Sequence, residues 1–160
     1  CDELKARLNT AIKKNIVPPK PVYVLMLIQM FEAYAKQSIE LTSYGHCYQQ
    51  LIYQSLEQAK VKNTEYDRYF NVLTELSWEI FDLKSGLNQH QLDVFFADYS
   101  QMYLAVNQKE IIDNLVGCRI LEWKDNKLKF KYPYIYYFFV GKKIAEYYTS
   151  QDLSLKHILR

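Results

Sequence analysis

The segment ILEWKDNKLKFKYPYIYYFFVG (residues 120–141) decides the fold, because the spacing of its apolar residues changes along its length. On both sides of Asp125-Asn126, apolar residues alternate with charged ones, which is typical of half-buried strands. Both turn residues tolerate a positive φ, so they predict a tight hairpin over about residues 119–132. A helix is predicted to follow from Pro133 to about Tyr148, because proline suits the first turn of a helix.

Alternation also predicts which side chains of the second strand face the core. Leu128, Phe130 and Tyr132 are predicted on the buried side, and Lys127, Lys129 and Lys131 on the solvated side. In the helix after Pro133, helical spacing predicts one packed side made of Tyr134, Tyr137, Phe138, Gly141, Ala145 and Tyr148.

Upstream of Gly117 the apolar residues follow helical spacing. Gly86 is predicted to be the left-handed residue that ends one of these helices. Predicted helices cover 2–14, 22–35, 42–60, 63–83, 88–103 and 107–117. The last three helices, the hairpin and the helix after it follow the order of a winged-helix unit. We therefore predict a mainly α fold, in which a helical bundle precedes a winged-helix unit with one two-stranded hairpin.

Composition narrows the class of protein without naming a function. The net charge of +2 is nearly balanced, so it gives no reason to expect nucleic acid or a membrane as partner. The chain shows no signal peptide and no apolar run long enough to span a membrane. Cys1, Cys47 and Cys118 are too far apart for a zinc motif, and they suggest a reducing, cytoplasmic setting.

No motif for catalysis is present. Glycines occur only at 45, 86, 117 and 141, so neither a P-loop nor a dinucleotide-binding motif can be written. The histidines, His46, His90 and His157, are isolated and lie on different predicted elements. We expect no catalytic residues, no bound metal and no cofactor of the chain's own, so the chain itself is not expected to be an enzyme.

A basic hairpin edge supports a different hypothesis, that of a DNA-binding winged helix. Lys124, Lys127, Lys129 and Lys131 would supply the positive charge. The candidate recognition helix, however, carries two acids and one base in residues 108–114, which suits phosphates poorly. The lysines are better explained as residues that protect an exposed strand edge, and we do not expect nucleic acid as a partner.

Three stretches resemble a known family. Phe130-Lys131-Tyr132 followed by Tyr137-Phe138-Phe139-Val140-Gly141 is similar in spacing to a strand of pattern F-x-H and a helix of approximate pattern Q-E-Y-F-A-A. Pro21 before Val22-Tyr23-Val24 resembles a GxP-type proline, although Val17 or Pro19 stands where glycine is expected, and residues 43–48 resemble a linking helix. These features resemble the region after the nucleotide-binding core in STAND-class P-loop ATPases, which are relatives of AAA+ and NACHT proteins.

The resemblance implies a regulatory role in a larger ATPase. It assigns residues 1–62 to a helical lid with linking helices, 63–150 to a winged-helix domain and 151–160 to a C-terminal connector. Pro21 and Tyr132 would contact ATP or ADP held by a P-loop core outside this chain. Tyr132 stands where the family has histidine, and a phenol can still donate a hydrogen bond. The implied partners are that core, a C-terminal sensor domain and further copies of the protein, in antiphage defence or signalling.

Three hypotheses therefore follow from the sequence. The first is a STAND regulatory module, the second a DNA-binding or protein-interaction winged helix, and the third a small enzyme domain without a motif. The chain begins at Cys1 within charged helical sequence, from which we expect it to be an internal fragment.

Overall fold

The computed structural model describes residues 43–158. The predicted helices at 2–14 and 22–35 lie outside these residues, and so does Pro21. The described elements are α3 (Ser43–Gln58), the short 3-10 turn η1 (Asn63–Glu65), α4 (Tyr66–Leu83), α5 (Gln89–Met102), α6 (Gln108–Gly117), β1 (Leu121–Lys124), β2 (Lys127–Phe130) and α7 (Pro133–Ile158). The prediction of a mainly α fold with one antiparallel hairpin is confirmed.

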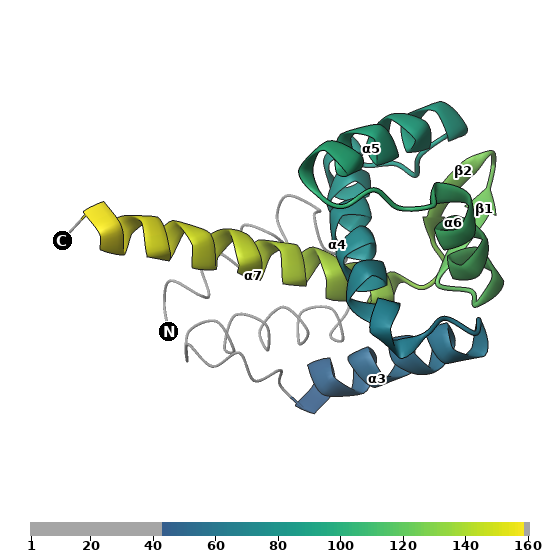
Figure 1. The fold of residues 1–160 in the computed structure, drawn as a ribbon, viewed down its shortest axis with the longest axis horizontal. Coiled ribbons are helices and arrows are strands. Elements are labelled where there is room, and N and C mark those ends of the chain that lie inside the picture. Colours follow the sequence, from purple (N-terminus) through teal and green to yellow (C-terminus); the bar gives the residue numbers. More distant parts are fainter. Residues whose placement is uncertain (1–42, 159–160) are drawn as a thin grey trace. The chain divides into compact units, whose positions relative to one another are not determined.

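The chain divides into two units. Gln49–Val140 forms one, and the remaining described residues, 43–48 and 141–158, belong to the other. The predicted division at residues 62 and 150 stays a prediction. Within Gln49–Val140, α5, α6 and the hairpin gather around the middle and upper part of α4 (Figure 1).

Helices α5 and α6 begin where side chains can bond their free backbone N–H groups. Asn88 accepts from the Gln91 N–H at 2.8 Å, and the Gln91 side chain accepts in return from the Asn88 N–H at 2.9 Å. Asn107 accepts from the Glu110 N–H at 3.2 Å. Both starts agree with the predicted ones, because capping is a local property of a few residues.

Two helices end in the same motif, with a basic residue in the left-handed conformation. At the end of α6, the Arg119 N–H donates to the Val116 carbonyl at 3.1 Å and the Ile120 N–H to the Leu115 carbonyl at 3.0 Å. Arg119 has φ 64°, and Ile120 and Leu115 are both buried. The end of α3 repeats this Schellman pattern, with Lys60 at φ 60°.

The end of α4 differs from the prediction. The left-handed residue is Lys84, at φ 55°, and no described glycine has a positive φ. Gly86 instead lies where β2 passes very close: a Cβ at this position would lie 2.6 Å from the Leu128 carbonyl oxygen. Gly86 is therefore required by a tertiary contact and not by its own backbone angles.

The hairpin has the predicted turn. Asp125 and Asn126 have φ 51° and 58°, and the ladder pairs Leu121 with Phe130 and Lys124 with Lys127. Positive φ at both turn residues is the signature of a type I′ turn. On its other edge β2 meets Leu87: the Leu87 N–H donates to the Leu128 carbonyl at 3.0 Å, and the Leu128 N–H to the Leu87 carbonyl at 2.7 Å. This bridge fastens the hairpin to the segment between α4 and α5.

The core of Gln49–Val140 is centred on α4 and the first turns of α7. Phe139 is fully buried, and its ring lies 5.4 Å from that of Phe70 on α4 and 6.0 Å from that of Phe130 on β2. The buried side of α7 in this unit consists of Ile135, Phe138, Phe139 and Val140. Of the predicted packed side, Phe138 is buried, whereas Tyr134 and Tyr137 are half-buried.

Candidate functional site at the hairpin and the first turn of α7

Tyr132, the predicted nucleotide contact, lies at the junction between β2 and α7. The prediction that it faces the core with Leu128 and Phe130 is wrong: β2 ends at Phe130, and Tyr132 is 37% exposed. Its carbonyl accepts from the N–H groups of Ile135 and Tyr136, both at 3.2 Å, so its backbone already serves the start of α7. Alternation stops where the helix begins, which is why the side chain leaves the buried face.

The surroundings of Tyr132 are aromatic and basic. Its ring stacks on Tyr134 with centroids 5.5 Å apart and an interplanar angle of 23°. The Lys131 ammonium lies 5.8 Å from the centre of the Tyr132 ring, within the range of a cation–π contact. The site thus offers an exposed phenol beside a cation, a combination that can bind an anionic oxygen. The contact to nucleotide stays a prediction.

The four predicted lysines follow the hairpin. The Lys129 ammonium lies 3.6 Å from the Glu122 carboxylate across the two strands. The Lys127 ammonium donates to the Ser85 hydroxyl at 2.8 Å, and Lys131 contacts the Tyr132 ring. Lys124 is exposed opposite Lys127 in the ladder. Three of the lysines therefore have local partners on or beside the hairpin.

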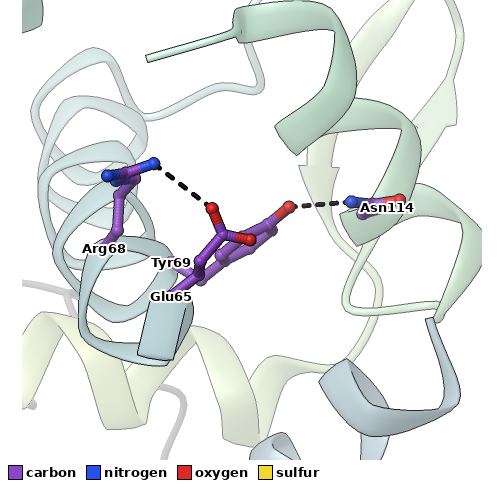
Figure 2. A network of polar contacts seen from close by, with 4 residues as sticks. All are labelled: Glu65, Arg68, Tyr69 and Asn114. Carbon is purple, nitrogen blue, oxygen red and sulfur yellow. Dashed lines mark hydrogen bonds and ion pairs between the residues drawn. The ribbon is translucent and has the colours of Figure 1, made fainter. Parts of the chain in front are cut away.

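Polar bonds hold α6 and α5 against α4, and these were not foreseen in the sequence. The Asn114 side-chain amide on α6 donates to the Tyr69 hydroxyl on α4 at 2.8 Å (Figure 2). Figure 2 also shows the ion pair between Arg68 and Glu65 beside this bond, at 3.4 Å. Burial raises the pKa of the Tyr69 hydroxyl, so it stays protonated and keeps its proton available to a further acceptor.

Two more bonds join α5 to α4 at matching spacing. The Tyr99 hydroxyl donates to the Asn71 side-chain oxygen at 2.5 Å, and the Tyr103 hydroxyl donates to the Glu75 carboxylate at 2.9 Å. Burial, with the charges of Tyr103 and Glu75, raises the pKa of Tyr99 to about 12. The Tyr99 phenol is therefore a hydrogen-bond donor at neutral pH. In the sequence, Asn71 and Glu75 are four residues apart, and so are Tyr99 and Tyr103. This spacing places each pair on one side of its helix, but it identifies bonding partners only once the two helices are known to be neighbours.

Asp93 joins the start of α5 to the start of α6. Its Oδ1 accepts from the Gln108 amide at 2.7 Å and from the Gln89 amide at 2.8 Å. These two bonds lower the pKa of the Asp93 carboxyl from its ordinary value of 3.8, and the bond from Gln108 has the larger effect. A depressed native pKa stabilises the folded state above the unfolded pKa, and this contribution disappears as pH falls through the native value.

We therefore expect Asp93→Asn to lower the melting temperature at neutral pH, with the difference from wild type shrinking below about pH 4. Thermal unfolding followed by circular dichroism at several pH values would measure it. Asp98→Asn, on the outer face of the same helix, is the matched control. A deficit of Asp93→Asn that persists unchanged at acid pH would show that the charge is not its cause.

The described residues provide no further chemical centre. Among residues 43–158, no group of three or more His, Cys, Asp and Glu side chains is placed to hold a metal ion. Burial raises the pKa of the Cys118 thiol, which is half-buried and free. In the same part of the chain, no helix has the length and the apolar content needed to cross a bilayer.

Comparison with known families supports the resemblance seen in the sequence. One family model matches the chain, over residues 87–140, and this model is described as Novel STAND NTPase 4. The matched segment contains α5, α6, the hairpin and the first turns of α7. The predicted STAND-class resemblance is thereby confirmed, and the match associates this segment with a STAND NTPase. No curated protein and no solved structure matches the chain.

Proposed function

We propose that this chain is a non-catalytic regulatory module of a STAND-type ATPase. The observation that carries the proposal is the family match over residues 87–140. The elements in and before this segment follow the order α4, the Leu87 bridge, α5, α6 and the hairpin. This order is similar to that of a winged-helix unit, with an isolated bridge at Leu87 on the outer edge of the two-stranded hairpin. Gln49–Val140 would then be the winged-helix unit, with α7 leading out of it.

The proposed mechanism is a two-state switch. ADP on a P-loop core outside this chain would be bridged by Pro21 and by Tyr132, and exchange for ATP would weaken the bridge and favour oligomerisation. Such coupling requires contacts that differ between the two states. The structural support is the position of Tyr132: an exposed phenol at the junction of β2 and α7 can reach a ligand outside the unit.

The cheapest test is the coding frame upstream of the Cys1 codon. The proposal expects this frame to continue into a segment with a Walker A motif, because the chain has no phosphate-binding loop. A frame that opens near Cys1 would overturn the proposal.

Duplex binding is the alternative, and the exposed face of α6 argues against it. Lys109 is exposed there together with Glu110 and Asp113, so the helix that would enter the major groove is acidic. We expect no duplex binding at low ionic strength in a fluorescence anisotropy titration. Binding that falls steeply with salt, and that is lost when Lys124, Lys127 and Lys129 become alanine, would establish the alternative instead.

A further inference from the structure

Charge is unevenly distributed within Gln49–Val140. Helices α4 to α6 carry eight acidic residues against two basic ones: Asp67, Glu75, Glu79, Asp82, Asp93, Asp98, Glu110 and Asp113 against Arg68 and Lys109. The hairpin region, 119–131, has the opposite sign, with Arg119, Lys124, Lys127, Lys129 and Lys131 against Glu122 and Asp125. One unit therefore presents two surfaces of complementary charge.

The basic surface has an exposed apolar side chain at its end. All five residues of Trp123–Lys127, which we name the hairpin tip, are exposed, and Trp123 is 41% exposed. Lys124 and Lys127 lie directly opposite each other in the ladder. Facing like charges destabilise a strand pair, and an anionic partner would relieve this repulsion. Trp123 pairs with Leu128 and therefore lies on the other face of the ladder, and exposed tryptophan is a residue enriched at the energetic centres of interfaces.

The acidic surface has a matching pattern on α5. Val94, Asp98 and Met102 follow one another at four-residue spacing and therefore lie along one side of the helix, which we name the α5 outer stripe. Val94 is 47% exposed and Met102 69% exposed, and Asp98 is exposed between them. An apolar stripe with a carboxylate at its centre suits a basic tip that carries an apolar ring.

We propose that the hairpin tip of one copy of this chain docks on the α5 outer stripe of a second copy. Both surfaces are exposed in the single chain, so neither covers the other. They share no residue, so the contact is head-to-tail and can be repeated from copy to copy. A tip on one helix buries little area, and the association of an isolated pair is therefore weak and dependent on salt. The inference rests on the proposed regulatory function, to which it supplies a contact for oligomerisation.

The test is a charge exchange measured by sedimentation velocity on the 160-residue chain, over a wide range of protein concentration and at two salt concentrations. Wild type is expected to self-associate, more strongly at low salt. Lys124→Glu alone and Asp98→Lys alone should each weaken self-association by about tenfold. Lys62→Glu, the same charge change at an exposed residue before η1, is the matched control and should behave as wild type.

Mixing the two variants separates a specific contact from a folding defect. In an equal mixture, Lys124 of the Asp98→Lys variant can meet Asp98 of the Lys124→Glu variant. The introduced glutamate and the introduced lysine can also meet, so association should return to the wild-type level. A monomeric wild type, unchanged association in Lys124→Glu, or a mixture that stays dissociated would each overturn the proposal. None of these results bears on nucleotide release or on the upstream coding frame, so the proposed function is tested separately.

Discussion

Phe139→Ala is expected to lower the free energy of unfolding by about 3–5 kcal/mol, the cost of emptying a large, fully buried aromatic site. Phe139 is fully buried and contacts rings on three elements: Phe70 on α4, Phe130 on β2 and its neighbour Phe138. Its removal leaves a cavity where α4, the hairpin and α7 meet. The first turns of α7 would lose their main attachment to the rest of Gln49–Val140.

Urea unfolding followed by tryptophan fluorescence measures this loss, because Trp78 and Trp123 both belong to Gln49–Val140. Met102→Ala is the control: this side chain is 69% exposed, so its truncation should change the free energy of unfolding by less than about 0.5 kcal/mol. Equal effects of the two variants would contradict the packing described for α7.

Gly86→Ala is expected to destabilise the chain by about 1–3 kcal/mol, the usual cost of forcing an extra carbon into a packed site. The added Cβ would lie 2.6 Å from the Leu128 carbonyl oxygen and 3.1 Å from the Lys127 Cβ. This carbonyl cannot easily move, because it accepts from the Leu87 N–H and belongs to β2. The bridge between Leu87 and Leu128 would have to open.

Gly117→Ala provides a matched control. Gly117 is the last residue of α6, and a Cβ there would meet nothing within 4 Å. The same substitution should therefore stabilise the chain, by about 0.5–1 kcal/mol, since alanine favours the helix. Thermal unfolding of both variants beside wild type gives the comparison. A Gly86→Ala variant as stable as Gly117→Ala would show that the close approach of β2 is not required.

The parts of the fold that the sequence could predict depend on local chemistry. Asn88 and Asn107 cap their helices through bonds to residues three positions later, and Asp125-Asn126 form the turn through their own φ angles. Each of these features involves only a few consecutive residues, so its residue types suffice to identify it.

The features that the sequence could not provide arise from contacts between distant segments. Gly86 is the clearest example: glycine near a helix end predicts a left-handed cap, whereas here it makes room for Leu128, and Lys84 takes the left-handed conformation. The bond between Asn114 and Tyr69 spans 45 residues and leaves no spacing signal in the chain. In the first turns of α7, aromatic residues occur on every side, so helical spacing alone could not show that Phe139 is the buried one.

The candidate site was located by resemblance and not by spacing. Alternation along β2 predicted a buried Tyr132, but β2 ends at Phe130 and α7 begins at Pro133, and the phenol between these two elements is exposed. The corrected position favours the proposed contact, because a buried hydroxyl could not reach a ligand outside the unit.

The most direct test of the regulatory role is the rate at which the whole ATPase releases bound ADP. Tyr132→Phe removes only the hydroxyl, Tyr132→Ala also removes the ring stacked on Tyr134, and Pro21→Ala alters the other predicted contact. Tyr103→Phe is the control, since Tyr103 is 39% exposed, close to the 37% of Tyr132, and the change removes a hydroxyl bonded to Glu75. Stopped-flow release of a fluorescent ADP analogue gives the rate. We predict that release accelerates by about tenfold in Tyr132→Phe and Tyr132→Ala, because each variant loses one hydrogen bond to a charged group. Release should also accelerate in Pro21→Ala. It should stay unchanged in Tyr103→Phe. Wild-type release rates in Tyr132→Ala and Pro21→Ala alike would contradict the account.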